Sequence, residues 1–217
     1  MPSFNPVYFL MGMAVLGLAP FLLMMMTSYV KIVVVTSLVR NALGVQQVPP
    51  TMVLNGLAII LTIFIMAPMA IKTMELLDTV TIESNPTPKE LGKIVQTISP
   101  PLRQFLAANA SESVTRVFIT TAKRMWPQQL HEHIAPDNFF ILVPSFTISE
   151  LTKAFQIGFL LYLPFIAIDL IISNILLAMG MMMVSPMTIS LPFKLLLFVT
   201  LDGWIKVSQG LLLSYVQ

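Results

Sequence analysis

Two groups of residues in this 217-residue chain have the types and spacing to do chemistry, a histidine pair and an isolated acid. His131 and His133 flank Glu132 and are the only histidines. Because alternate helix positions do not share a face, this order makes a poor zinc site, and a surface charge cluster is the better interpretation. The sequence has no Gly-rich phosphate loop and no cysteine, which excludes thiolate metal sites and cysteine nucleophiles. We therefore expect no enzyme, no metal and no cofactor.

Asp169 is the more informative acid, because it is the only charged residue between positions 157 and 184. A carboxylate in a long apolar run is costly, faces protein or water, and is often paired. Two interpretations are open. Asp169 is either an ion-coupling or proton-relay site, or a structural partner of a neighbouring helix or subunit, for which Lys194 is a candidate. The structural interpretation is favoured, because a relay needs a second intramembrane acid and a carrier usually shows an internal repeat.

Methionine is the third unusual feature, with 16 in the chain and five of them between Met179 and Met187. An ideal helix places Met179 and Met183 on one face and Met181 nearly opposite, whereas a break at Gly180 would let several point the same way. Methionine is flexible and fills irregular gaps. The cluster therefore has two interpretations, which are ordinary packing against lipid or core, and a deformable apolar gasket built from several copies around an axis.

The amino-acid composition indicates what kind of segments position these residues. Apolar residues make up 56% and charged residues 10% of the chain, against about 25% charged in soluble domains, so a soluble globular protein is nearly excluded. The net charge of +2 is too small to indicate nucleic-acid binding. Sixteen of the 22 charged residues lie in 72–153. This division predicts an N-terminal apolar helical hairpin (1–71), a polar, extracytoplasmic helical insert (72–146) and C-terminal apolar helices with the methionine loop (147–217).

The expected fold is all-α, with Pro-kinked apolar helical hairpins flanking the polar insert. Apolar runs cover residues 7–26, 52–71, 157–184 and 189–216, and the last is one bent helix or two helices broken near Asp202. Kinks are expected at Pro20, Pro68 and Pro164. In the insert, we expect one helix capped by Thr87 that stops before Pro100, and a second helix over 111–125. A capping box of Thr147 and Glu150 predicts that the third apolar helix begins there.

Four stretches of the sequence resemble the FliP/SctR family, and the resemblance as a whole extends over nearly the whole chain. They are residues 38–50 (LVRNALGVQQVPP), 144–158 (PSFTISELTKAFQIG), 178–184 (AMGMMMV) and 192–204 (PFKLLLFVTLDGW). The GVQQ at 44–47 favours the injectisome, SctR, branch over the flagellar FliP branch. One departure is the SP at 185–186, where flagellar members tend to have two prolines.

The resemblance implies a non-enzymatic, pore-forming core subunit of the type III secretion export gate in the bacterial inner membrane. Family members form a pentamer with SctS- and SctT-type subunits, and the assembled helical gate sits on the periplasmic side of the bilayer. The implied partners also include SctU- and SctV-type export components, translocated substrate proteins and membrane lipid, but no nucleic acid.

The resemblance also implies roles for individual residues. The family's methionine loop seals the pore, which places Met181, Met182 and Met183 at the constriction with Met179 beside them. Independently of the resemblance, we predict that four charged residues hold neighbouring helices or subunits together, namely Glu150, Lys153, Asp169 and Lys194. The alternative function is an ion-coupled secondary membrane transporter that uses Asp169.

Overall fold

The computed structural model describes residues 13, 17–18, 20–45, 47–80 and 88–216, and over this part of the chain every regular element is a helix. The all-α prediction is confirmed. Half of the first apolar run (residues 7–12, 14–16 and 19) and Thr87 lie outside the described residues. The elements are α2 (Tyr29–Ala42), α3 (Thr51–Asp78), α4 (Pro88–Ile98), α5 (Pro100–Asn109), α6 (Glu112–Met125), the 3₁₀ helix η1 (Gln128–His133), α7 (Phe139–Ala178), α8 (Pro186–Thr200) and α9 (Gly203–Leu213).

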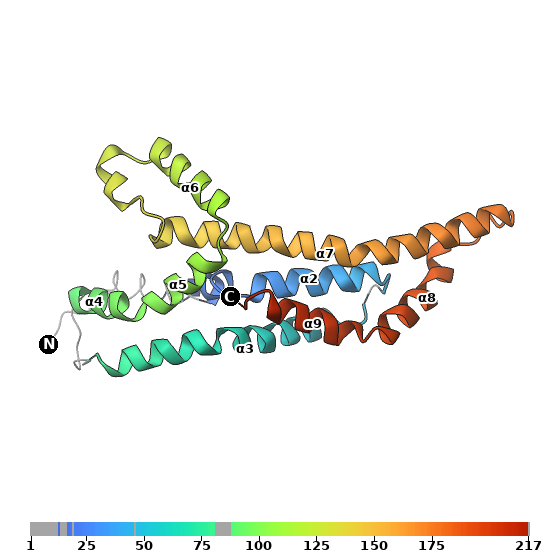
Figure 1. The fold of residues 1–217 in the computed structure, drawn as a ribbon, viewed down its shortest axis with the longest axis horizontal. Helices are drawn as coiled ribbons and strands as arrows, with labels where there is room; N and C mark the ends of the chain where they lie inside the picture. The colour runs from blue at the N-terminus through green and yellow to red at the C-terminus, as the bar shows by residue number, and fades with distance from the viewer. Residues whose placement is uncertain (1–12, 14–16, 19, 46, 81–87, 217) are drawn as a thin grey trace.

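Helix α7 is the scaffold of the molecule and runs along its long axis for 40 residues (Figure 1). It begins at Phe139, and its N-cap Asn138 accepts a hydrogen bond from the backbone N–H of Phe140 at 2.9 Å. The prediction that this helix begins at Thr147 is wrong. The Thr147 hydroxyl instead donates to the carbonyl of Val143 one turn earlier, at 2.9 Å, as threonines inside helices commonly do. Helix α7 therefore continues through the compositional boundary at residue 147.

The core forms where α2 packs between α7 and α3. Ile32, Val35 and Val39 of α2 are fully buried there. The close approach of α2 to α7 depends on Gly158, because a Cβ at this position would lie 2.2 Å from Cδ1 of Leu38. A methyl group at this position would force Leu38 to move or the two helices to separate.

The last apolar run forms two helices, α8 and α9, whose axes differ by 59°. Asp202 precedes α9 in the left-handed conformation with φ 51°. The ring of Phe198 lies directly against Gly203 and meets the Trp204 ring edge-on, with centroids 5.3 Å apart. The last apolar run is therefore two helices that meet in a bend near Asp202, and aromatic side chains pack inside this bend.

The insert lies at the end of the molecule that is farther from the α7–α8 connection (Figure 1). Helix α4 ends at Ile98 before Pro100, and α6 is preceded by Ser111 and ends at Met125, so both predicted insert helices are confirmed. Helix α6 rises away from α7, and η1 brings the chain back to the start of α7.

In the described part of the chain, α3 and α7 are long and apolar enough to cross a membrane, and α8 with α9 would make a third span if the bent pair counts as one. Both helices continue through their internal prolines, Pro68 in α3 and Pro144 and Pro164 in α7. Much of their apolar surface is unpartnered within the chain. On α3, for example, Ile60, Ile63 and Phe64 are each about two thirds exposed, at 66%, 65% and 68%. This surface needs lipid or other subunits to cover it.

Candidate functional site

The methionine loop, residues 179–185, connects α7 to α8 at one tip of the elongated molecule (Figure 1). Gly180 adopts φ 72°, where glycine avoids the penalty of a Cβ. Its N–H donates to the carbonyl of Leu177 at 3.0 Å, and the N–H of Met181 donates to that of Leu176 at 2.9 Å. These two bonds form the Schellman motif that commonly ends a helix. Gly180 thus stops α7 and turns the chain into the loop.

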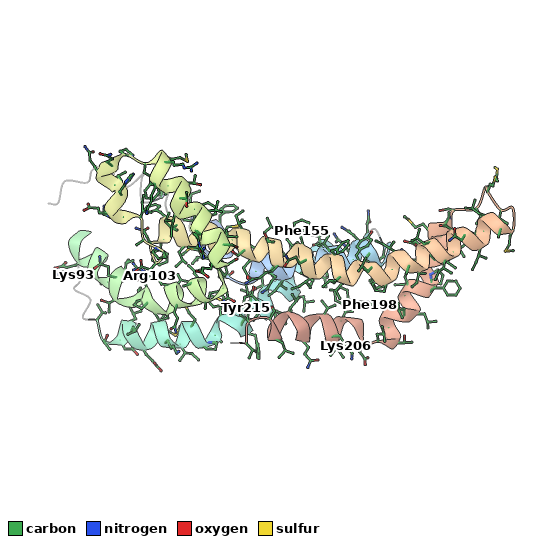
Figure 2. The ribbon with its side chains drawn as sticks, turned by 45° about the horizontal axis from the view of Figure 1, so that its top comes forward. Lys93, Arg103, Phe155, Phe198, Lys206 and Tyr215 are labelled. Carbon is green, nitrogen blue, oxygen red and sulfur yellow. The ribbon has the colours of Figure 1, made fainter. Side chains whose placement is uncertain are left out.

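The thioether side chains of this loop are exposed. Met182 and Met183 are 81% and 99% exposed, Met179 is 66% exposed, and Met181 is 42% exposed. Sulfur atoms gather at this tip beyond the last turn of α7 (Figure 2). Met187 lies in the first turn of α8 and is also exposed. A largely exposed apolar tip is the kind of surface that a partner or a membrane covers.

Behind the loop, Asp169 of α7 pairs with Lys194 of α8, with Nζ and Oδ2 2.6 Å apart. The hydroxyl of Ser190 donates to the other oxygen of Asp169 at 2.6 Å. Lys194 is almost fully buried and also donates to the carbonyl of Ala42, at the C-terminal end of α2, at 3.3 Å. A cation there also neutralises the negative end of the helix dipole. These contacts, which we call the Asp169 joint, fasten the α7–α8 hairpin to α2.

A second polar cluster surrounds Glu150 of α7, whose side chain is fully buried. The ammonium of Lys31 in α2 lies 3.1 Å from Oε2, and that of Lys153 lies 3.2 Å from Oε1. The phenol of Tyr215, beyond α9, donates to Oε2. Lys153 also donates to the carbonyl of Asn109 at 2.6 Å. This Glu150 joint connects α2, α7, the end of α5 and the C-terminal segment.

The Tyr215 ring extends the Glu150 joint. The Lys31 ammonium lies 3.4 Å from the centre of this ring, and the ring stacks on Phe105 with centroids 6.0 Å apart. Burial lowers the pKa of Lys31, and the carboxylate of Glu150 opposes that shift. Burial and the same carboxylate raise the pKa of Tyr215, so the phenol keeps its proton and remains a donor.

The structure distributes the sequence-predicted residues over these three places. Glu150 and Lys153 lie in one joint, Asp169 and Lys194 in the other, and the methionines at the tip. Sequence reasoning missed Lys31, Tyr215 and Ser190. An isolated lysine near apolar runs was a signal that could have found Lys31, because such a charge needs a partner. No local signal marks Tyr215.

The histidine cluster shows no catalytic geometry. Nε2 of His131 lies 3.0 Å from the carbonyl of Trp126, and Nε2 of His133 lies 3.6 Å from Glu132 in a pair that is mostly exposed. Among the described residues, no group of three or more histidines and acids could hold a metal ion.

These features define a class, an all-helical protein with apolar helices of membrane-crossing length, buried ionic joints and an exposed apolar tip. The FliP family sequence profile matches residues 12–211, and the chain belongs to this family.

The chain is also similar to curated proteins along nearly its whole length. It is 52% identical over 203 residues to the Yop proteins translocation protein R of Yersinia pestis, covering 94% of this chain and 93% of that protein. It is 51% identical over 191 residues to the virulence protein YscR of Salmonella typhimurium, covering 87% of each. It is 44% identical over 201 residues to the hypersensitivity response secretion protein HrcR of Ralstonia nicotianae, covering 92% and 93%. Relatives of this kind place the chain on the injectisome, SctR, branch.

Proposed function

We propose that this chain is a core subunit of the type III protein secretion export gate and that its methionine loop seals the pore. The homologues are type III secretion translocation proteins, which supports the general role. The observation that carries the finer proposal is the loop itself. Its thioethers are exposed, up to 99% at Met183, at the tip of a hairpin that two joints hold in place.

In the proposed mechanism, several copies, five by family resemblance, assemble with SctS- and SctT-type subunits in the bacterial inner membrane. The gate lies on its periplasmic side, and SctU- and SctV-type components deliver the substrate. The unpartnered apolar faces of α3 and α7 are then buried against neighbouring subunits and lipid. The methionine loops meet around one axis and exclude water and ions. An unfolded substrate displaces the flexible thioether side chains as it passes.

The Asp169 joint supports a structural role for its charges in this mechanism. A carrier that used Asp169 for ion coupling would need a carboxylate that exchanges its partner during transport. Asp169 instead has a close ammonium at 2.6 Å and a hydroxyl donor at 2.6 Å, both from α8. We therefore assign Asp169 and Lys194 to holding the hairpin, and Glu150 and Lys153 to holding the helices behind it.

A leak assay tests the gasket proposal. Substituting Met181, Met182 and Met183 together by alanine should let small solutes cross the membrane of cells that assemble the gate. The matched control replaces three equally exposed methionines elsewhere, Met52, Met74 and Met125, which are 85%, 65% and 74% exposed. The control should stay tight. A loop variant that assembles normally and stays as tight as the control would contradict the gasket proposal.

A further inference from the structure

A groove of about 520 Å³ lies between α3, α5 and the C-terminal end of α9. This volume is in the range of natural small-molecule sites, about 300–1,000 Å³. Most of its wall is apolar and comes from all three elements, including Phe64 and Met69 of α3, Pro101 of α5, and Leu213 of α9. The Tyr215 ring closes one side, so the groove adjoins the Glu150 joint.

Among the described residues that line this groove, one is charged. Lys72 of α3 is exposed, and no acidic residue is found among the described residues that line the groove. Among the described residues, Lys72 has no ion-pair partner. The other polar side chains at the wall include Asn109, whose amide donates to the carbonyl of Phe105, and Tyr215, whose phenol donates to Glu150. Within the part of the chain that the structure describes, Lys72 is therefore the free cation of a mostly apolar site.

The position of Lys72 along α3 indicates which kind of ligand can contact its ammonium group. The preceding 20 residues, 52–71, carry no charge, and α3 is long and apolar enough to cross a membrane. A lysine directly after such a run lies where side chains extend toward lipid head groups. The groove therefore opens beside the end of an apolar surface that would face acyl chains.

We propose that this groove binds an anionic phospholipid, with one acyl chain in the apolar groove and the phosphate beside Lys72. The volume of the groove favours a lipid acyl chain over a segment of protein as its occupant. A helix about 10 Å across would fill the groove with roughly one turn, which is too little for a docking site. A flexible acyl chain can follow the groove and leave its anionic head at the free ammonium.

Native mass spectrometry of the full-length, detergent-purified protein tests this proposal. The probes are phosphatidylglycerol and phosphatidylcholine with identical acyl chains, added in equal amounts. The wild type should retain phosphatidylglycerol about fivefold better, the ratio that one lysine near an anionic lipid surface provides. Lys72→Gln should abolish this preference. Lys93→Gln is the matched control, because Lys93 is an exposed lysine on α4 that lies away from Tyr215 and the groove (Figure 2).

A second variant tests the apolar part of the site. Ala108 is an exposed residue of α5 that lines the groove, so Ala108→Phe should fill it and lower the retention of both lipids. Equal retention of the two lipids by the wild type, or the same result for Lys72→Gln and Lys93→Gln, would overturn the proposal. Loss of the lipid on co-purification with SctS- or SctT-type subunits would show that a protein segment occupies the groove instead, and would overturn it as well.

Discussion

Replacing Glu150 by glutamine should destabilise this protein by about 3–5 kcal/mol, the usual cost of removing one partner of a buried ion pair. Glutamine has nearly the same shape and can still accept a hydrogen bond from Tyr215, so the variant removes mainly the negative charge. Lys31, which is 1% exposed, would then be a buried cation whose nearest carboxylate is gone. Its ring contact with Tyr215 replaces only a small part of that interaction.

A double variant separates the stability lost through the unpaired charge from the stability lost through disturbed core packing. Replacing a buried ion pair by apolar residues of similar volume is often close to neutral. Lys31→Met combined with Glu150→Leu should therefore be much more stable than Glu150→Gln alone. Lys153, which is 39% exposed, can turn toward solvent when the carboxylate is removed. Unfolding by a denaturing detergent in mixed micelles, followed by circular dichroism, measures the differences in the free energy of unfolding.

The matched control for this prediction is Glu112→Gln in α6. Glu112 pairs with Arg116 at 2.9 Å, but the two side chains are 88% and 71% exposed, so little stability should be lost. If Glu150→Gln costs no more than Glu112→Gln, the buried charges of the Glu150 joint do not stabilise the fold. If the double variant is as unstable as Glu150→Gln, the loss comes from packing rather than from the unpaired charge.

Three further predictions concern the scaffold and the loop. Gly158→Ala should cost about 1–3 kcal/mol by overpacking against Leu38, and Leu38→Ala should restore part of that loss in a double-mutant cycle. Gly180→Ala should cost about 1–2 kcal/mol because φ is 72°, whereas Gly210→Ala, in an open helical position, should stabilise by about 0.5–1 kcal/mol; thermal unfolding measures both. Asp169→Asn should weaken subunit assembly, measured by mass after purification, and a variant that assembles fully but loses secretion would favour ion coupling instead.

The features that the sequence predicted correctly have local causes. Prolines and the turn at Asp202–Gly203 act on their immediate neighbours, so helix ends at Ile98 and Met125 could be placed from the chain alone. The start of α7 was mispredicted because Thr147 and Glu150 carry a capping pattern, although the helix is already established at Phe139. A threonine in a helix interior satisfies its hydroxyl within the helix, and the pattern alone does not distinguish the two cases.

The joints depend on contacts between distant positions, which periodicity does not reveal. The sequence left a pair between Asp169 and Lys194 open as one alternative, because both charges stand isolated in apolar runs. Tyr215 reaches Glu150 from 65 residues away, beyond the end of α9. Only the packing of α2, α7 and α9 around one core brings that phenol to the buried carboxylate.

Crosslinking at a single introduced cysteine tests the central claim most directly, because the natural chain has none. Met182→Cys places a thiol in the middle of the methionine loop, and Met52→Cys places one at an equally exposed site on α3, 81% against 85% for the native residues. With a secretion substrate stalled in the assembled gate, Met182→Cys should crosslink to the substrate and Met52→Cys should not. Equal crosslinking at both sites, or none at Met182→Cys while the variant still secretes, would contradict a pore sealed by this loop.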